Sequence, residues 1–99
     1  MAPDWDIVVT AEASFDGWLA QVALRRGALE HHYRVRVPDI AWRRMTGGAV
    51  PVEELLRATF EFLLAREPPE SILGTFEVTV VPKYFPEYEA AMKARFAGR

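Results

Sequence analysis

The residues of this sequence that could carry chemistry are few, and their spacing favours structural roles. The two histidines, His31 and His32, are adjacent. Adjacent residues of a strand point to opposite faces, so this pair cannot bind one metal ion without a bulge. The carboxylates of Glu53–Glu54 and of Glu87–Glu89 stand where helices are expected to begin, and acidic side chains there stabilise the positive end of the helix dipole. Neither group predicts a metal site or an acid–base pair.

Motifs for nucleophilic or phosphate chemistry are missing. The chain has no cysteine, so it has no thiolate nucleophile, no disulfide and no cysteine-ligated metal. Ser14 and Ser71 lie in no Gly-x-Ser-x-Gly elbow, and no glycine-rich phosphate loop is present. We therefore expect no catalytic residue, cofactor or metal, and the sequence favours a non-enzymatic protein over an enzyme, which a deep pocket holding polar groups with perturbed pKa values would indicate.

A basic strand is the first candidate binding feature. Six arginines stand between positions 25 and 44 against two acidic residues, a local charge of +4 in a chain whose net charge is −2. Within this region apolar residues alternate with basic ones, which predicts a strand with one face on a core and the other in water. The face in water carries His32, Arg34 and Arg36, which we treat as candidate nucleic-acid contacts.

Three aromatic residues are the second candidate feature. Most aromatic side chains fall on predicted apolar faces, where they supply bulk to a core. Trp5, Trp42 and Tyr84 do not fall on such faces. If they share a surface patch, that patch is a candidate protein interface, because exposed apolar patches on small domains mark partner surfaces.

Length and composition are those of one folded domain, which we assign to residues 1–99. The chain has 99 residues, of which 51% are hydrophobic and 26% charged. A chain of this size buries about two-thirds of the surface that it exposes when unfolded. The N-terminus lacks the pattern of a secretory signal, and no apolar run approaches the ~20 residues that span a bilayer. We expect a cytoplasmic protein that does not contact membranes.

Hydrophobic periodicity predicts an antiparallel sheet in the first third of the chain. Three amphipathic segments, roughly 6–12, 18–25 and 32–37, form a three-stranded meander over residues 5–37. Asp16–Gly17 is expected to turn the chain between the first two strands. Because such a sheet leaves its edges open, self-association or addition of a partner strand is expected, and the protein is a candidate homodimer.

Helices are predicted after Pro38. A short helix over 40–45, capped by Asp39, has little apolar surface to bury, and glycines stop it after Thr46. A longer helix begins at Pro51 and ends at Pro68–Pro69. Further helical turns are expected over 69–73 and from Pro86. The segment 78–81 fits either a strand or a helical turn, and we favour the helix. The predicted fold is α+β, with the helices packed on one face of the meander.

The order of strand, short helix and longer helix from Tyr33 to Arg66 resembles a ribbon-helix-helix DNA-binding unit. In that family a strand from each of two chains pairs across a dimer axis and lays its polar face in the major groove. The resemblance implies that Arg34 and Arg36 contact bases or phosphates, beside His32. The two preceding strands compete with this arrangement, since pairing within the chain would occupy the strand edge.

A larger part of the chain resembles a small family of uncharacterised prokaryotic proteins. The matching segments are Thr46–Gly48, Glu53–Leu55, Phe60–Leu64, Glu70–Leu73 and Tyr84–Tyr88. The resemblance implies no activity, cofactor or partner, since none is assigned to the family. The sequence therefore favours a protein-interaction or regulatory module that binds an unknown partner or itself, and DNA binding through the basic strand is the alternative.

Overall fold

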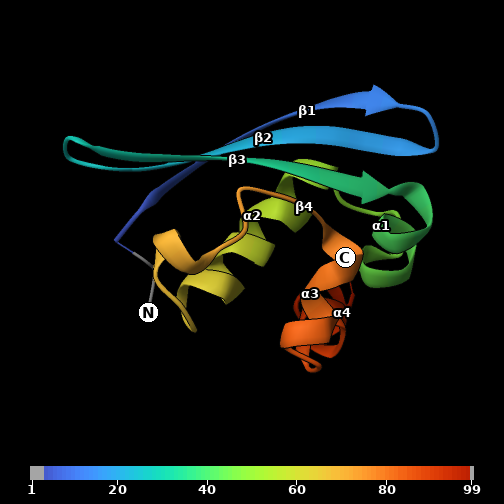
Figure 1. Cartoon of the computed structure of the whole chain (residues 1–99). Helices are drawn as coiled ribbons and strands as arrows, with labels where there is room; N and C mark the ends of the chain where they lie inside the picture. Colours follow the sequence, from blue (N-terminus) through green and yellow to red (C-terminus); the bar gives the residue numbers. More distant parts are fainter. Residues whose placement is uncertain (1–3, 99) are drawn as a thin grey trace.

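The computed structural model describes residues 4–98 and has one mixed sheet with helices on a single side (Figure 1). Three strands, β1 (Asp6–Ser14), β2 (Gly17–Arg26) and β3 (Leu29–Pro38), form an antiparallel meander. The short strand β4 (Thr75–Glu77) pairs in parallel with β3, so the order across the sheet is β1-β2-β3-β4. The predicted α+β class and the antiparallel meander are confirmed.

The helical elements follow the meander along the chain and lie below the sheet in Figure 1. They are α1 (Asp39–Thr46), α2 (Val52–Leu64), the 3-10 turns η1 (Pro69–Ser71) and η2 (Val78–Val80), α3 (Val81–Tyr84) and α4 (Tyr88–Phe96). Segment 78–81 is helical, as the sequence favoured. Among the residues that the structure describes, no helix is long and apolar enough to cross a membrane.

The sheet has one buried face because apolar residues alternate along its strands. On β3, Tyr33, Val35 and Val37 are buried, while the residues between them face outward. The helix α2 lies against this face and buries nearly all of its apolar side chains. The side of α2 that faces the sheet is entirely buried and consists of Val52, Leu55, Leu56, Thr59, Phe60, Phe62 and Leu63.

Strand β4 is a correction to the predicted three-stranded sheet. It has three residues, of which only Phe76 is buried, so it shows no period that could be recognised in the sequence. The strand exists because the chain returns to the sheet after α2 and pairs with β3, where Val35 lies beside Phe76. A tertiary contact creates this strand, and local preference does not.

The helix boundaries differ from those predicted: α1 spans Asp39–Thr46, α2 begins at Val52, and α4 begins at Tyr88. Asp39 is the first residue of α1 and does not cap it; the carboxylate accepts a hydrogen bond from Arg43 Nε at 2.7 Å. The helix also buries Ala41, Met45 and Thr46, so the expectation that it buries little was wrong. The helix α2 ends at Leu64, and a hydrogen-bonded turn continues from it to Glu67, directly before the prolines.

The turn between β1 and β2 uses Asp16 and Gly17 differently from the prediction. Asp16 is the residue with positive φ, at 58°, and Gly17 is already the first residue of β2. A Cβ atom on Gly17 would lie 2.2 Å from the Val37 carbonyl oxygen on β3. Glycine is required here because two strands approach closely, and the turn itself would tolerate another residue at this position.

Substitution Gly17→Ala is expected to lower the free energy of unfolding by ~1–3 kcal/mol, the usual cost of overpacking, because the added methyl group meets backbone atoms. Gly74→Ala is the matched control. No atom lies within 4 Å of a Cβ at that position. The measurement is urea unfolding of both variants. Equal stabilities would contradict the steric role of Gly17.

Candidate functional site

The three basic residues singled out in the sequence lie on the outward face of β3. His32, Arg34 and Arg36 alternate with the buried residues of that strand, as predicted. No helix covers this face of the sheet in Figure 1. The three side chains differ, however, in the ion pairs that they form.

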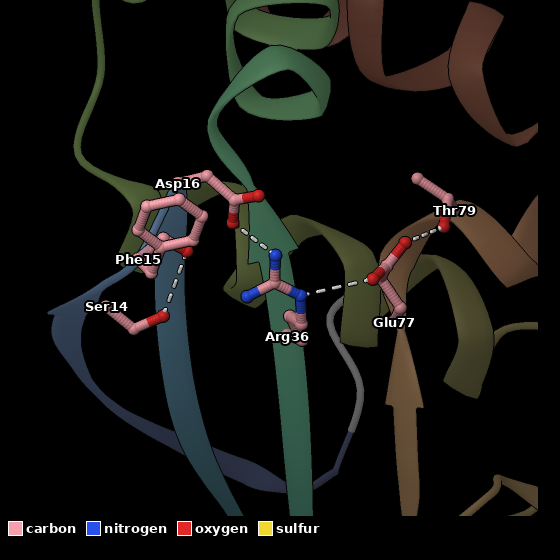
Figure 2. A network of polar contacts seen from close by, with 6 residues as sticks. All are labelled: Ser14, Phe15, Asp16, Arg36, Glu77 and Thr79. Atoms are coloured by element: carbon pink, nitrogen blue, oxygen red, sulfur yellow. Dashed lines mark hydrogen bonds and ion pairs between the residues drawn. The ribbon is translucent and has the colours of Figure 1, made fainter.

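Arg36 is held by two carboxylates, as Figure 2 shows. Its guanidinium pairs with Asp16 in the β1–β2 turn and, through Nε at 3.2 Å, with Glu77 on β4. The hydrogen bond to Asp16 raises the pKa of Arg36 above its ordinary value. His32 Nε2 lies 2.6 Å from a carboxylate oxygen of Glu30. Within residues 4–98 only Arg34 of the three has no ion pair, so the basic face offers one free cation.

The intermolecular ribbon implied by the ribbon-helix-helix resemblance would have to displace β4 from Arg34–Arg36 of β3. Its whole length pairs with β2 on one edge, and Arg34–Arg36 pair with Thr75–Glu77 on the other edge. Where both edges are occupied, a strand cannot add a strand from a second chain. The stretch that carries Arg34 and Arg36 therefore cannot pair with a second copy in this structure.

The three aromatic residues proposed as one interface have different neighbours. Trp5 packs edge-on against His31, with ring centroids 5.4 Å apart. Trp42 donates from Nε1 to the Val50 carbonyl at 2.8 Å and packs against Trp18. Tyr84 is 66% exposed and lines a hollow beside β4. The hollow at Tyr84 is the feature that leads to a candidate site.

This hollow is an apolar cavity of about 220 Å³ between α2, η1, β4 and α3. Its floor is buried, whereas Leu73 and Tyr84 at its rim are half-exposed or more. The residues that line it are Leu63, Glu67, Ser71, Ile72, Leu73, Phe76, Val80, Val81, Tyr84 and Phe85. A second hollow continues along β4 and shares Leu73, Phe76 and Val80 with the first. We call the two hollows together the β4 groove.

Buried contacts hold the walls of the β4 groove in place. Tyr33 on β3 donates its hydroxyl hydrogen to the Pro69 carbonyl at 2.8 Å, which fastens η1 under the sheet. The Phe60 ring of α2 packs against both Tyr33 and Phe76, at centroid distances of 5.1 and 6.1 Å. Burial, with smaller effects from Glu67 and Glu70, raises the pKa of Tyr33 to about 12. These contacts join η1, α2 and β4 to the sheet around the groove.

The outer edge of β4 borders the groove and is unpaired. The Arg34 amide donates to the Gly74 carbonyl at 2.8 Å. Because neighbouring residues of a strand direct their backbone groups to opposite edges, Phe76 also points toward β3, whereas Thr75 and Glu77 point away from it. In the part of the chain that the structure describes, no further strand pairs with β4. These backbone groups are thus free to bond to another chain.

Figure 2 shows how polar contacts fix the position of β4. Glu77 accepts from Arg36 with one carboxylate oxygen and from the Thr79 hydroxyl with the other. Arg36 in turn is anchored by Asp16. Arg36 is therefore better described as a residue that positions β4 than as a free contact for nucleic acid.

The β4 groove is lined by both negatively and positively charged side chains. Glu67 lines the first hollow and Lys83 lines the second. Neither side chain forms an ion pair within residues 4–98, so both charges are available to a ligand. No group of three metal-ligating side chains occurs among these residues.

The sequence did not identify the groove. Of its lining residues only Tyr84 was singled out, and the adjacent pairs Ile72–Leu73 and Tyr84–Phe85 are the one local signal that could have indicated it. No family model matches the chain, and no curated protein or solved structure matches it either. The groove must therefore be interpreted from its own geometry.

Substitutions at Arg36 and Arg34, two neighbouring positions on the same face of β3, test whether the Arg36 ion pairs fix the position of β4. Arg36→Gln removes the link to Asp16 and Glu77, so we expect the Phe76 amide to exchange with solvent several-fold faster. Arg34→Gln removes a side chain on the same strand face that has no ion pair, and should leave this exchange unchanged. Hydrogen exchange followed by NMR measures both. Equal effects would contradict the positioning role of Arg36.

The raised pKa of Tyr33 predicts that the folded protein loses stability at alkaline pH. In the unfolded chain this tyrosine ionises near its ordinary pKa of ~10, whereas in the folded protein its pKa is about 12. The unfolded state therefore binds fewer protons between these values, and the free energy of unfolding falls as the pH rises through them. Urea unfolding at several pH values should show a smaller fall for Tyr33→Phe. An identical fall in both proteins would show that Tyr33 does not contribute.

Proposed function

We propose that the protein is a non-enzymatic interaction module that binds an extended peptide segment of a partner protein beside β4. The observation that carries this proposal is the coincidence of an unpaired strand edge with an apolar cavity next to it. Strand addition of this kind takes its affinity from main-chain hydrogen bonds and its specificity from pockets that receive alternate side chains.

The cavity is suited to one large apolar side chain. Its volume is about 220 Å³, and an engineered apolar cavity of ~150 Å³ already accommodates benzene. Phe76 points to the same face of β4 as the cavity, so a side chain of an added strand that points to this face would enter it. A leucine, isoleucine or phenylalanine in the bound segment fits this site.

The charges at the groove define the flanks of the bound segment. A basic residue on the side of Glu67 and an acidic residue on the side of Lys83 would each meet an opposite charge. Opposite charges across an interface favour one orientation of a ligand over the other. We therefore expect the segment to bind in one direction.

DNA binding through the open sheet face is the second candidate function. The observation that favours it is the exposed side chain of Arg34, which forms no ion pair within residues 4–98. Binding to duplex DNA draws most of its affinity from several neutralised phosphates. Of the three side chains proposed for this role, Arg36 is engaged by Asp16 and Glu77, and His32 by Glu30. The groove beside β4 is the stronger basis for a function.

Fluorescence polarisation with labelled synthetic heptapeptides tests peptide binding directly. The peptides have a central leucine in a threonine-rich context, with a lysine at one end and a glutamate at the other, in both orders. We expect one order to bind more tightly. N-methylation of the peptide backbone should lower affinity ~10-fold at alternate positions, where an amide bonds to β4, and little at the positions between them.

Leu73→Asp and Ile40→Asp separate the groove from the rest of the surface. Both residues are exposed apolar residues, at 50% and 70%, and Ile40 lies on α1 outside the groove. Leu73→Asp should abolish peptide binding, and Ile40→Asp should preserve it. Equal loss at every methylated position, or equal effects of the two variants, would contradict strand addition. Binding of a labelled mixed-sequence DNA duplex that Arg34→Ala removes, without peptide binding, would support the second candidate instead.

A further inference from the structure

The strand β1 forms the other edge of the sheet, and it is much longer than β4. It spans Asp6–Ser14 and pairs with β2 on one side only. Natural edge strands are protected by prolines, lysines, bulges or covering segments. β1 contains no proline and no lysine, its pairing with β2 is regular from end to end, and its two charged residues, Asp6 and Glu12, lie toward its ends.

The backbone groups on the free side of β1 follow from the hairpin. Ser14 and Gly17 flank the two-residue turn, and such a flanking pair is hydrogen-bonded. Every second residue from Asp6 to Ser14 therefore points to β2, and the residues between them point outward: Ile7, Val9, Ala11 and Ala13. The hydrogen bond from Arg57 on α2 to the Ile7 carbonyl, at 2.6 Å, agrees with this direction.

Arg57 protects only the first of these four positions. Among the described residues, no hydrogen bond from another element reaches the backbone of Val9, Ala11 or Ala13. The side chains of Val9 and Ala11 are only partly buried. A long unpaired edge with partly covered apolar side chains is therefore present beside α2.

We propose that this edge pairs with β1 of a second copy of the chain, antiparallel, with Thr10 opposite Thr10. The two sheets would then form one continuous sheet of eight strands. This inference does not depend on peptide binding, since it uses the opposite edge of the sheet from β4.

The register follows from length and charge. In a symmetric antiparallel pair, one residue lies opposite its own copy across the two-fold axis. Thr10 is the middle residue of β1, so placing Thr10 opposite Thr10 pairs the whole strand. It places Asp6 opposite Ser14 and Val8 opposite Glu12. A register centred on Val9 would place Asp6 opposite Glu12, and like charges opposite each other are destabilising.

The same register fixes which groups bond across the interface. Val9 of each copy lies opposite Ala11 of the other copy. The outward backbone groups of these two residues exchange hydrogen bonds. Thr10 then forms a non-hydrogen-bonded pair with its counterpart, with Cα atoms ~4.5 Å apart. Threonine pairs opposite each other on a sheet are favourable.

Engineered cysteines test this register, because the natural chain contains no cysteine. Cα atoms ~4.5 Å apart lie within the range that a disulfide spans, so Thr10→Cys should form a covalent dimer under mild oxidation. Val8→Cys is the control on the same strand and face. Its two copies would lie four residues apart along the strand, roughly 13 Å, which is too far. Cross-linking of both variants, or of neither, would overturn the register.

Sedimentation analysis tests the dimer itself. The natural chain should have about twice the monomer mass of 11.2 kDa. Thr10→Lys should be monomeric because two lysines would face each other, and mixing it with Thr10→Glu should restore a dimer. Gln21→Lys places the same charge one strand further in, opposite Thr10 on β2, and should remain dimeric. A natural chain that sediments as a monomer would overturn the proposal. Peptide binding at β4 would be unaffected by that result.

Discussion

The sheet has one buried face, and the rest of the structure depends on this constraint. The strands β1 to β3 place most of their apolar side chains on the same side, where all the helices pack. The helix α2 supplies most of this cover and contacts β1 most extensively among the strands. Because every helix is used on one side, the opposite face and both edges of the sheet remain open. These open surfaces are where a protein without a recognisable catalytic motif can act.

A buried pair of hydroxyl groups holds α4 against α2 under the sheet. Thr59 donates its only hydroxyl hydrogen to the Leu55 carbonyl at 2.8 Å, so Tyr88, 2.7 Å away, must donate to Thr59. Burial raises the pKa of Tyr88 well above its ordinary value and keeps it a donor. Within the described residues no buried side-chain nitrogen or oxygen lacks a hydrogen-bond partner. The buried polar side chains that join α2 and α4 are therefore paired with one another.

The sequence predicted those parts of the structure that repeat with a regular period. Alternation along β3 identified both its buried and its outward face. Strand β4 could not be found, since three residues carry no period. The role of Gly17 was also hidden, because it depends on the approach of Val37 from another strand. The groove is invisible for the same reason: four separate segments form it, and only tertiary contacts bring them together.

The two edges of the sheet have different chemistry, and this difference separates their expected roles. The edge at β1 is nine residues long, so in the proposed dimer it would select its partner by length and register. The edge at β4 has three residues, too few to bind through main-chain hydrogen bonds alone, but an apolar cavity adjoins it. Pairing through β1 would place the two β4 edges at the opposite ends of one eight-stranded sheet. A partner with two suitable segments would then bind the dimer more tightly than either site alone, because the second contact becomes intramolecular.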